Sequence, residues 1–149
     1  MPKNELTIDF VVTAYIVYRK KVLLILHKKL NLWLPIGGHI ESKEDPEQAI
    51  LREINEECGL KVKIFSSKPK MKTDTKFLYT PNFLDIHSIS KNHKHICFNY
   101  LAKATSGNIK LNKAEHNDIR WFSEKDLEDK NYPTKKNVIF VAKQALKVK

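Results

Sequence analysis

Three glutamates in the first half of the chain, Glu53, Glu56 and Glu57, have the type and spacing of ligands for a divalent cation. In a helix, residues at positions i, i+3 and i+4 lie within one turn of each other, so the three carboxylates would project together. Like charges at this spacing destabilise a helix by roughly 0.2–0.5 kcal/mol per pair. A hard cation with oxygen ligands would offset that repulsion, whereas the alternative is an ordinary solvated acidic face.

The sequence around these glutamates carries the marks of a helix with defined ends. Asp45 is a suitable N-cap, Pro46 suits the first helical position, and Gln48 stands where a capping box has Glu or Gln. Gly59 follows as a C-terminal stop. The helical period predicts a core face made of four residues: Ile50, Leu51, Ile54 and Cys58. Cys58 is therefore interpreted as a small core residue and not as a thiol catalyst.

The rest of the chain must supply the layers against which this helix packs. Strands are predicted at Ile8–Tyr18, Val22–His27, Lys61–Ser67, Phe77–Ile89, His95–Ala104 and Ile119–Phe122. A second helix is predicted at Thr134–Val148, and loops at Gly37–Glu44 and Leu111–Arg120. Strands mixed with two sizeable helices indicate layers of helix and sheet, and we expect one domain over residues 1–149.

The charge of the chain is high and unevenly distributed. Lysine and arginine outnumber aspartate and glutamate by 27 to 17, which gives a net charge of +10. Between Gly38 and Leu60, however, seven acidic and two basic residues give −5. An acidic patch in a basic protein suits a metal and phosphate site, because carboxylates hold the cation and lysines attract the anion. Lysine-rich composition without a functional meaning is the alternative.

Cysteine content and hydropathy exclude several classes of protein. The two cysteines, Cys58 and Cys97, lie 39 residues apart, so neither a disulfide-stapled miniprotein nor a C-x-x-C metal pair is indicated. We expect a reducing, cytoplasmic location. The most apolar stretch, Phe10–Tyr18, has nine residues, too few to span a membrane, and the basic run Arg19–Lys21 replaces a signal-peptide cleavage site. No membrane partner is expected.

The acidic segment has a spacing that resembles a known motif. Gly38 is followed by five residues, Glu44, seven residues, and then the run REINEECGL from Arg52 to Leu60. This resembles the Nudix box, G-x5-E-x7-R-E-U-x-E-E-x-G-U with U apolar, and every defined position matches. The lead-in from Trp33 also resembles the usual one, with two departures. Ile36 separates Pro35 from the double glycine, and Ser42-Lys43 replaces a common glycine before Glu44.

The resemblance implies a Nudix-type α/β/α sandwich, with a mixed β-sheet flanked by the box helix and by the C-terminal helix. It also implies a hydrolase that cleaves a diphosphate bond in a nucleoside diphosphate linked to another moiety X, with water attacking phosphorus. The implied cofactor is Mg²⁺ or Mn²⁺, and the implied substrate is a small nucleotide-like molecule.

The resemblance also assigns roles to residues of the box. Glu56 and Glu57 would ligate the cation, Glu53 would be a further ligand or the base that activates water, and Arg52 would orient Glu53. The carbonyl of Gly37 is an expected extra ligand. Gly38 and Glu44 are expected to shape the loop. Glu115, six residues before Trp121, is a candidate acid for the metal cluster, against an ordinary exposed loop residue.

Residues outside the box offer weaker signals. His93 and His95 share a strand face, and such a pair can bind zinc, but no third ligand is spaced to complete a site. Together with His87 they could instead line the substrate cleft or have no role. The run His27-Lys28-Lys29 could contact phosphate or could be a solvated hairpin end.

Two other functions remain open. One is an isomerase of allylic diphosphates with the same fold, for which neither Cys58 nor Cys97 is a convincing catalytic cysteine. The other is a non-catalytic basic module that binds nucleotides or nucleic acid, which the net charge permits. Such a module would not need three glutamates on one helix face, so nucleic acid is possible but not favoured as a partner.

Overall fold

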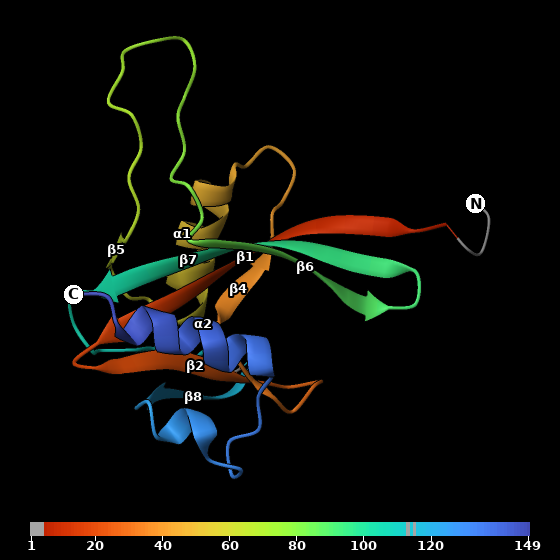
Figure 1. Cartoon of the computed structure of the whole chain (residues 1–149), viewed down its shortest axis with the longest axis vertical. Coiled ribbons are helices and arrows are strands. Elements are labelled where there is room, and N and C mark those ends of the chain that lie inside the picture. Colours follow the sequence, from red (N-terminus) through yellow and green to blue (C-terminus); the bar gives the residue numbers. More distant parts are fainter. Residues whose placement is uncertain (1–4, 113, 115) are drawn as a thin grey trace.

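Two long strands, β1 (Thr7–Tyr18) and β7 (His93–Ala104), lie parallel at the centre of the fold (Figure 1). The computed structural model describes residues 5–112, 114 and 116–149, and within these residues the sheet has eight strands. The other strands are β2 (Lys21–His27), β3 (Trp33–Leu34), β4 (Ile36–His39), β5 (Val62–Ile64), β6 (Phe83–Ser90) and β8 (His116–Phe122). The helices are α1 (Pro46–Glu57), the short 3₁₀ helix η1 (Asp126–Glu128) and α2 (Lys136–Leu146).

Each central strand has two different neighbours along its length. The middle of β1, Val11–Ala14, pairs with β4, and its last residues, Val17 and Tyr18, pair with β2. Likewise β7 pairs with β6 along most of its length and with β5 near its end. All of these pairs are antiparallel, so the sheet is mixed, as the sequence predicts.

The β1–β2 hairpin turns at Arg19 and Lys20, both of which have positive φ, 47° and 62°. Two successive positive φ values are typical of a type I′ turn, whose twist matches that of the flanking strands. The predicted hairpin is therefore confirmed, with β2 beginning at Lys21.

The alternation of side chains along β1 separates two cores. Val12, Ala14 and Ile16 pack in one cluster with the apolar side of α1. Tyr15 and Val17 pack in a second cluster with the apolar side of α2. Since successive residues of a strand point to opposite faces, the two helices cover opposite faces of the sheet. This confirms the predicted helix–sheet–helix layers.

Several predicted boundaries were wrong. The strand predicted from Phe77 begins only at Phe83. Pro81 has no N–H to donate to a neighbouring strand, and side-chain hydrogen bonds of Asn82 replace backbone strand pairing at this point. That side chain donates to the carbonyl of Phe65 and accepts from the N–H of Leu101. The strand predicted at Lys61–Ser67 spans only Val62–Ile64, the part that pairs with β7.

Two predicted loops contain strands. Residues Ile36–His39 form β4, because β1 is long enough to pair with both β2 and β4. The strand predicted at Ile119–Phe122 begins earlier, at His116 within the predicted loop, and this strand, β8, pairs with β2. Among the described residues, we find no helix whose length and hydropathy would let it cross a membrane.

Candidate active site

The ends of helix α1 fix the register of its glutamates. The carboxylate of Asp45 accepts from the N–H of Gln48 at 2.9 Å, and the Gln48 side chain accepts from the N–H of Asp45 at 2.9 Å. This is the predicted capping box, followed by Pro46 at the first position. At the other end Gly59 adopts φ +67°, and its N–H donates to the carbonyl of Ile54.

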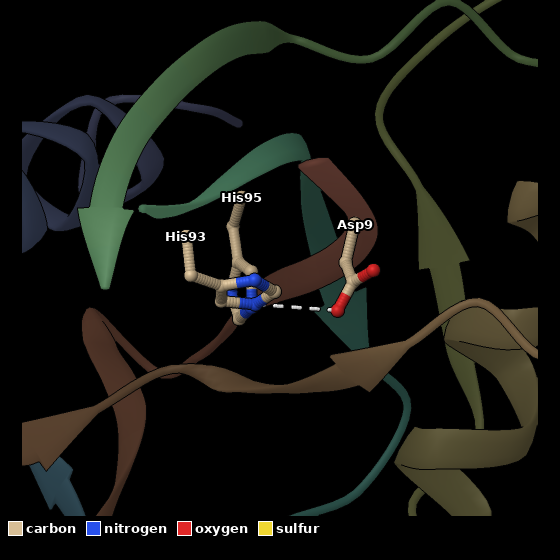
Figure 2. A group of neighbouring side chains, drawn as sticks. All are labelled: Asp9, His93 and His95. Atoms are coloured by element: carbon tan, nitrogen blue, oxygen red, sulfur yellow. Dashed lines mark hydrogen bonds and ion pairs between the residues drawn. The ribbon is translucent and has the colours of Figure 1, made fainter. Parts of the chain in front are cut away.

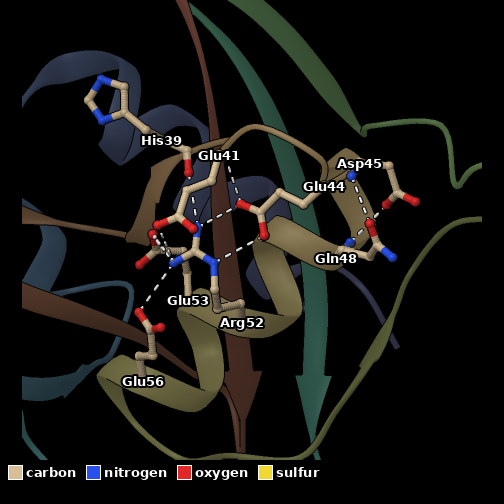
Figure 3. A network of polar contacts seen from close by, with 8 residues as sticks. All are labelled: His39, Glu41, Glu44, Asp45, Gln48, Arg52, Glu53 and Glu56. Atoms are coloured by element: carbon tan, nitrogen blue, oxygen red, sulfur yellow. Dashed lines mark hydrogen bonds and ion pairs between the residues drawn. The ribbon is translucent and has the colours of Figure 1, made fainter.

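Arg52 is the centre of a polar network at this helix (Figure 3). Its guanidinium donates two hydrogen bonds to Glu44, at 2.8 and 3.1 Å, and one to the backbone carbonyl of His39 at 3.0 Å. Its Nη1 donates to Oε1 of Glu53 at 3.0 Å and to Glu56 at 3.2 Å. These partners, Glu44 first among them, raise the pKa of Arg52 above its ordinary value. The guanidinium thus fixes two of the three glutamates relative to the loop before the helix.

Glu44 links that loop to the helix. Besides its two contacts with Arg52, its Oε1 accepts from the N–H of Glu41 at 2.8 Å. The hydrogen bond from Arg52 is the main cause that holds the pKa of Glu44 below its ordinary value. The carboxylate therefore stays ionised and joins both ends of the loop from residue 41 to the helix.

Lys43 occupies the place where the motif commonly has glycine, and its φ of 70° lies in the left-handed region. This conformation costs a non-glycine residue about 1–2 kcal/mol. Glycine avoids that cost, but the greater conformational entropy of its unfolded chain offsets part of the gain in stability. We expect Lys43→Gly to raise the free energy of unfolding by about 0.5–1 kcal/mol, measured by urea denaturation. The neighbouring Ser42→Gly, at a position without positive φ, should lower it instead. Equal effects of the two variants would contradict this account.

Gly38 lies where the carboxylate of Glu53 meets the backbone of β4. A Cβ atom at this glycine would stand 2.2 Å from Oε1 of Glu53, much closer than van der Waals contact allows. The absence of a side chain is therefore what lets the Glu53 carboxylate lie against the strand.

Gly37 is placed one residue earlier in the same strand, opposite Thr13 of β1. The N–H of Ile40 donates to the carbonyl of Phe10, and hydrogen-bonded pairs alternate along an antiparallel ladder. Gly37 falls between bonded pairs, so its carbonyl is expected to point away from β1. That leaves the carbonyl available as a ligand.

Two of the three glutamates are buried. Glu53 is 8% exposed and Glu57 2% exposed, whereas the Glu56 side chain is 46% exposed. Oε2 of Glu57 lies 3.3 Å from Nε2 of His116, a buried residue of β8. Burial, and then the adjacent carboxyl of Glu57, raise the pKa of Glu53 to about 8. Two carboxyl groups this close cannot both ionise at little cost without a cation between them.

The three glutamates line a cleft of about 790 Å³. Basic residues line it too: Lys28, Lys29, Arg52 and Lys135. The sheet contributes a polar wall made of Thr13, Asp85, His87, His95 and Asn99. Gly37 and Gly38 also reach the cleft. Acidic groups for a cation and basic groups for an anion thus surround the same space, of the size that small-molecule sites have.

A family model described as the NUDIX domain matches residues 9–141. The chain belongs to the Nudix hydrolase family. The predictions of the family, of the mixed α/β fold and of a Nudix-type hydrolase are therefore confirmed. A comparison with curated protein sequences gives no match.

Solved structures of other proteins resemble the chain over nearly its whole length. A Nudix-family hydrolase from Clostridium perfringens is 36% identical, with a TM-score of 0.81 over 95% of this chain and 97% of that one. An ADP-ribose pyrophosphatase from Streptococcus suis is 18% identical, with a TM-score of 0.61 over 96% and 95%. An Ap4A hydrolase from C. elegans is 20% identical, with a TM-score of 0.62 over 92% and 90%. The last two show likeness of fold alone.

The cysteines of this Nudix hydrolase are buried free thiols. Burial raises the pKa of Cys58 to about 11 and that of Cys97 to about 12. Cys58 packs in the core with α1, as predicted, and Cys97 donates to the side-chain oxygen of Asn99. A thiol with so high a pKa is a poor nucleophile at neutral pH.

The fold brings to the cleft of this Nudix hydrolase a residue that the sequence patterns do not indicate, His116. His116 lies beside Glu57, and only its place next to Glu115 could have signalled it. Glu115 itself lies outside the described residues. The prediction that Leu51 packs in the core was wrong, since it is 50% exposed on the side of α1 away from the sheet.

Proposed function

We propose that this Nudix hydrolase cleaves a diphosphate bond in a small molecule that joins a nucleoside diphosphate to another moiety. Water attacks phosphorus, and a divalent cation, Mg²⁺ or Mn²⁺, is bound among the glutamates of α1. The observation that carries the proposal is the burial of Glu53 and Glu57 against each other in a cleft that basic side chains also line.

The donor set fits a hard divalent cation. Glu56, Glu57 and Gly37 all line the cleft, and carboxylate and carbonyl oxygens suit Mg²⁺ and Mn²⁺. The raised pKa of Glu53 supports the fit, because a bound cation would favour the ionised carboxylates. When bound, the cation supplies positive charge that stabilises the charge developing on the phosphate oxygens.

We assign to Glu53 the task of accepting the proton of the attacking water. Its Oε1 accepts a hydrogen bond from Nη1 of Arg52 at 3.0 Å, which holds the carboxylate at the cleft. A carboxylate within hydrogen-bond reach of the attacking water can take its proton. Arg52, which holds both Glu44 and Glu53, orients the carboxylate for this step.

The substrate class is supported by the charge of the cleft and by the structural neighbours. Lys28, Lys29 and Lys135 line the cleft and would attract phosphate groups, although Lys28 also donates to the carbonyl of Ala114 at 3.0 Å. Two structures of similar fold are named as an ADP-ribose pyrophosphatase and an Ap4A hydrolase. A cytoplasmic location, which the proposal includes, agrees with two cysteines that remain free thiols.

The test is a panel of nucleotide derivatives incubated with the protein in Mg²⁺ or Mn²⁺. Nucleoside triphosphates, ADP-ribose, dinucleoside polyphosphates and capped RNA would represent different moieties X. We expect a monophosphate product from at least one of them, with oxygen from ¹⁸O-labelled water in a phosphate group. Removal of divalent cations with EDTA should lower the rate by roughly a hundredfold or more.

Two outcomes would contradict the proposal. A panel member that is bound without turnover, with an affinity that falls steeply as salt rises, would indicate a basic binding module. Turnover without incorporation of labelled oxygen would indicate isomerisation or transfer. The buried thiols already make the allylic diphosphate isomerase a weaker alternative.

A further inference from the structure

A second group of ligand-type side chains lies at the beginning of β1 and β7, apart from the glutamates of α1. It consists of Asp9, His93 and His95, whose ligand atoms all lie within 4.8 Å of one another (Figure 2). Nε2 of His93 is 3.2 Å from Oδ2 of Asp9 and 3.2 Å from Nε2 of His95. The three side chains are partly exposed, so an ion from solvent can reach them.

The two separations of 3.2 Å from Nε2 of His93 are close to those of ligands around one tetrahedral zinc ion. Zn–N distances of about 2.0–2.1 Å place neighbouring ligand atoms of a tetrahedron about 3.3 Å apart. Two imidazole nitrogens and a carboxylate oxygen are a donor set that zinc accepts, whereas magnesium prefers oxygen alone. Three protein ligands leave a fourth position open.

The sheet fixes this arrangement. Asp9 is the register partner of His95 in the parallel β1–β7 pair, and His93 precedes His95 by two residues on the same face. The hydroxyl of Thr7 lies 2.8 Å from Nδ1 of His93 and so turns its Nε2 toward the cluster. A partner on the second nitrogen of a ligating histidine is a regular feature of zinc sites.

We infer that Asp9, His93 and His95 form a binding site for one zinc ion at the rim of the substrate cleft. His39 lies beside this cluster. Its Nε2 is 3.5 Å from Oδ2 of Asp9, and its ring centroid is 4.9 Å from that of His95. Because His39 and His95 also line the cleft, the ion would border the space where the substrate is proposed to bind. The inference does not depend on that proposal.

The test is zinc binding by untagged protein that has been stripped of metal and dialysed into millimolar Mg²⁺, which occupies carboxylate sites. Zn²⁺ is titrated calorimetrically, and Co²⁺ serves as a spectroscopic probe because tetrahedral Co²⁺ absorbs strongly in the visible range. We expect one Zn²⁺ per chain. Asp9→Asn and His93→Gln should each weaken binding by about tenfold to a hundredfold or more and should remove the tetrahedral Co²⁺ spectrum.

His87→Gln is the matched control. His87 is a histidine of the same sheet face, with its ring 5.7 Å from that of His95, but its Nδ1 lies 2.8 Å from Asp85 instead. This variant should bind zinc within about threefold of the wild type, a change too small for a lost ligand. Zinc should raise the melting temperature of the wild type and of His87→Gln, but not that of the other two. No zinc binding, or equal binding by all four proteins, would overturn the inference.

Discussion

Replacement of Glu57 by glutamine is expected to lower the turnover number by roughly a hundredfold or more while the protein stays folded. The Glu57 side chain is 2% exposed and lies beside Glu53 and His116. Glutamine has the same volume but no charge, so it would hold a cation and its phosphate far less well. Turnover is measured with Mg²⁺ on whichever panel member is cleaved fastest.

Glu47→Gln is the control for this variant. Glu47 is another buried glutamate of α1, but it lies outside the cleft and accepts from Lys68 at 2.9 Å and from the N–H of Tyr79 at 2.8 Å. Its loss should lower the free energy of unfolding and leave turnover within about twofold. Rates like those of the wild type for Glu57→Gln would refute the role of Glu57.

The local part of the site could be predicted because it depends on sequence spacing alone. Asp45, Pro46 and Gly59 set where α1 begins and ends, and the spacing from Gly38 then determines which glutamates face the cleft. Gly38 and Glu53 stand 15 residues apart in sequence and still meet, because the loop between β4 and α1 returns the chain to the same place. The motif therefore describes one continuous segment, from β4 through the loop to α1, whose own contacts bring these residues together.

Which side chains of α1 are buried was predicted less well, although the angular positions of the residues around the helix explain part of the observed burial. Glu57 follows Ile50 by seven residues and so lies about 20° from it, within the buried side. Leu51 lies about 100° from Ile50, which is far enough to reach solvent. Apolar character alone assigned Leu51 to the core, but it is 50% exposed.

The histidine cluster could not be predicted because it depends on long-range pairing. Asp9 and His95 are 86 residues apart, and only the parallel register of β1 and β7 makes them neighbours. From the sequence alone the pair His93 and His95 has no third ligand. Knowledge of which strands pair, and in which register, supplies that ligand and changes the interpretation of the pair.

Replacement of Glu53 by glutamine is expected to lower turnover by a similar factor, roughly a hundredfold or more, and also to change how stability depends on pH. In the absence of a divalent cation the pKa of Glu53 is raised from its ordinary 4.5 to about 8. Between these values the folded protein keeps a proton that the unfolded chain has lost. The contribution of Glu53 to stability is thus complete below about pH 4.5 and disappears as the pH rises through about 8.

The glutamine side chain of Glu53→Gln cannot ionise, so it stays neutral at every pH, as the protonated glutamate is at low pH. In EDTA the free energy of unfolding of this variant should therefore fall less than that of the wild type between pH 5 and pH 8, as measured by urea denaturation. At pH 8, Mg²⁺ should raise the free energy of unfolding of the wild type more than that of the variant. The cation favours ionised carboxylates, and the variant has one carboxylate fewer. Parallel pH profiles of the free energy of unfolding for the two proteins would show that the pKa of Glu53 is not raised by folding. A variant with full turnover would remove it from the catalytic step.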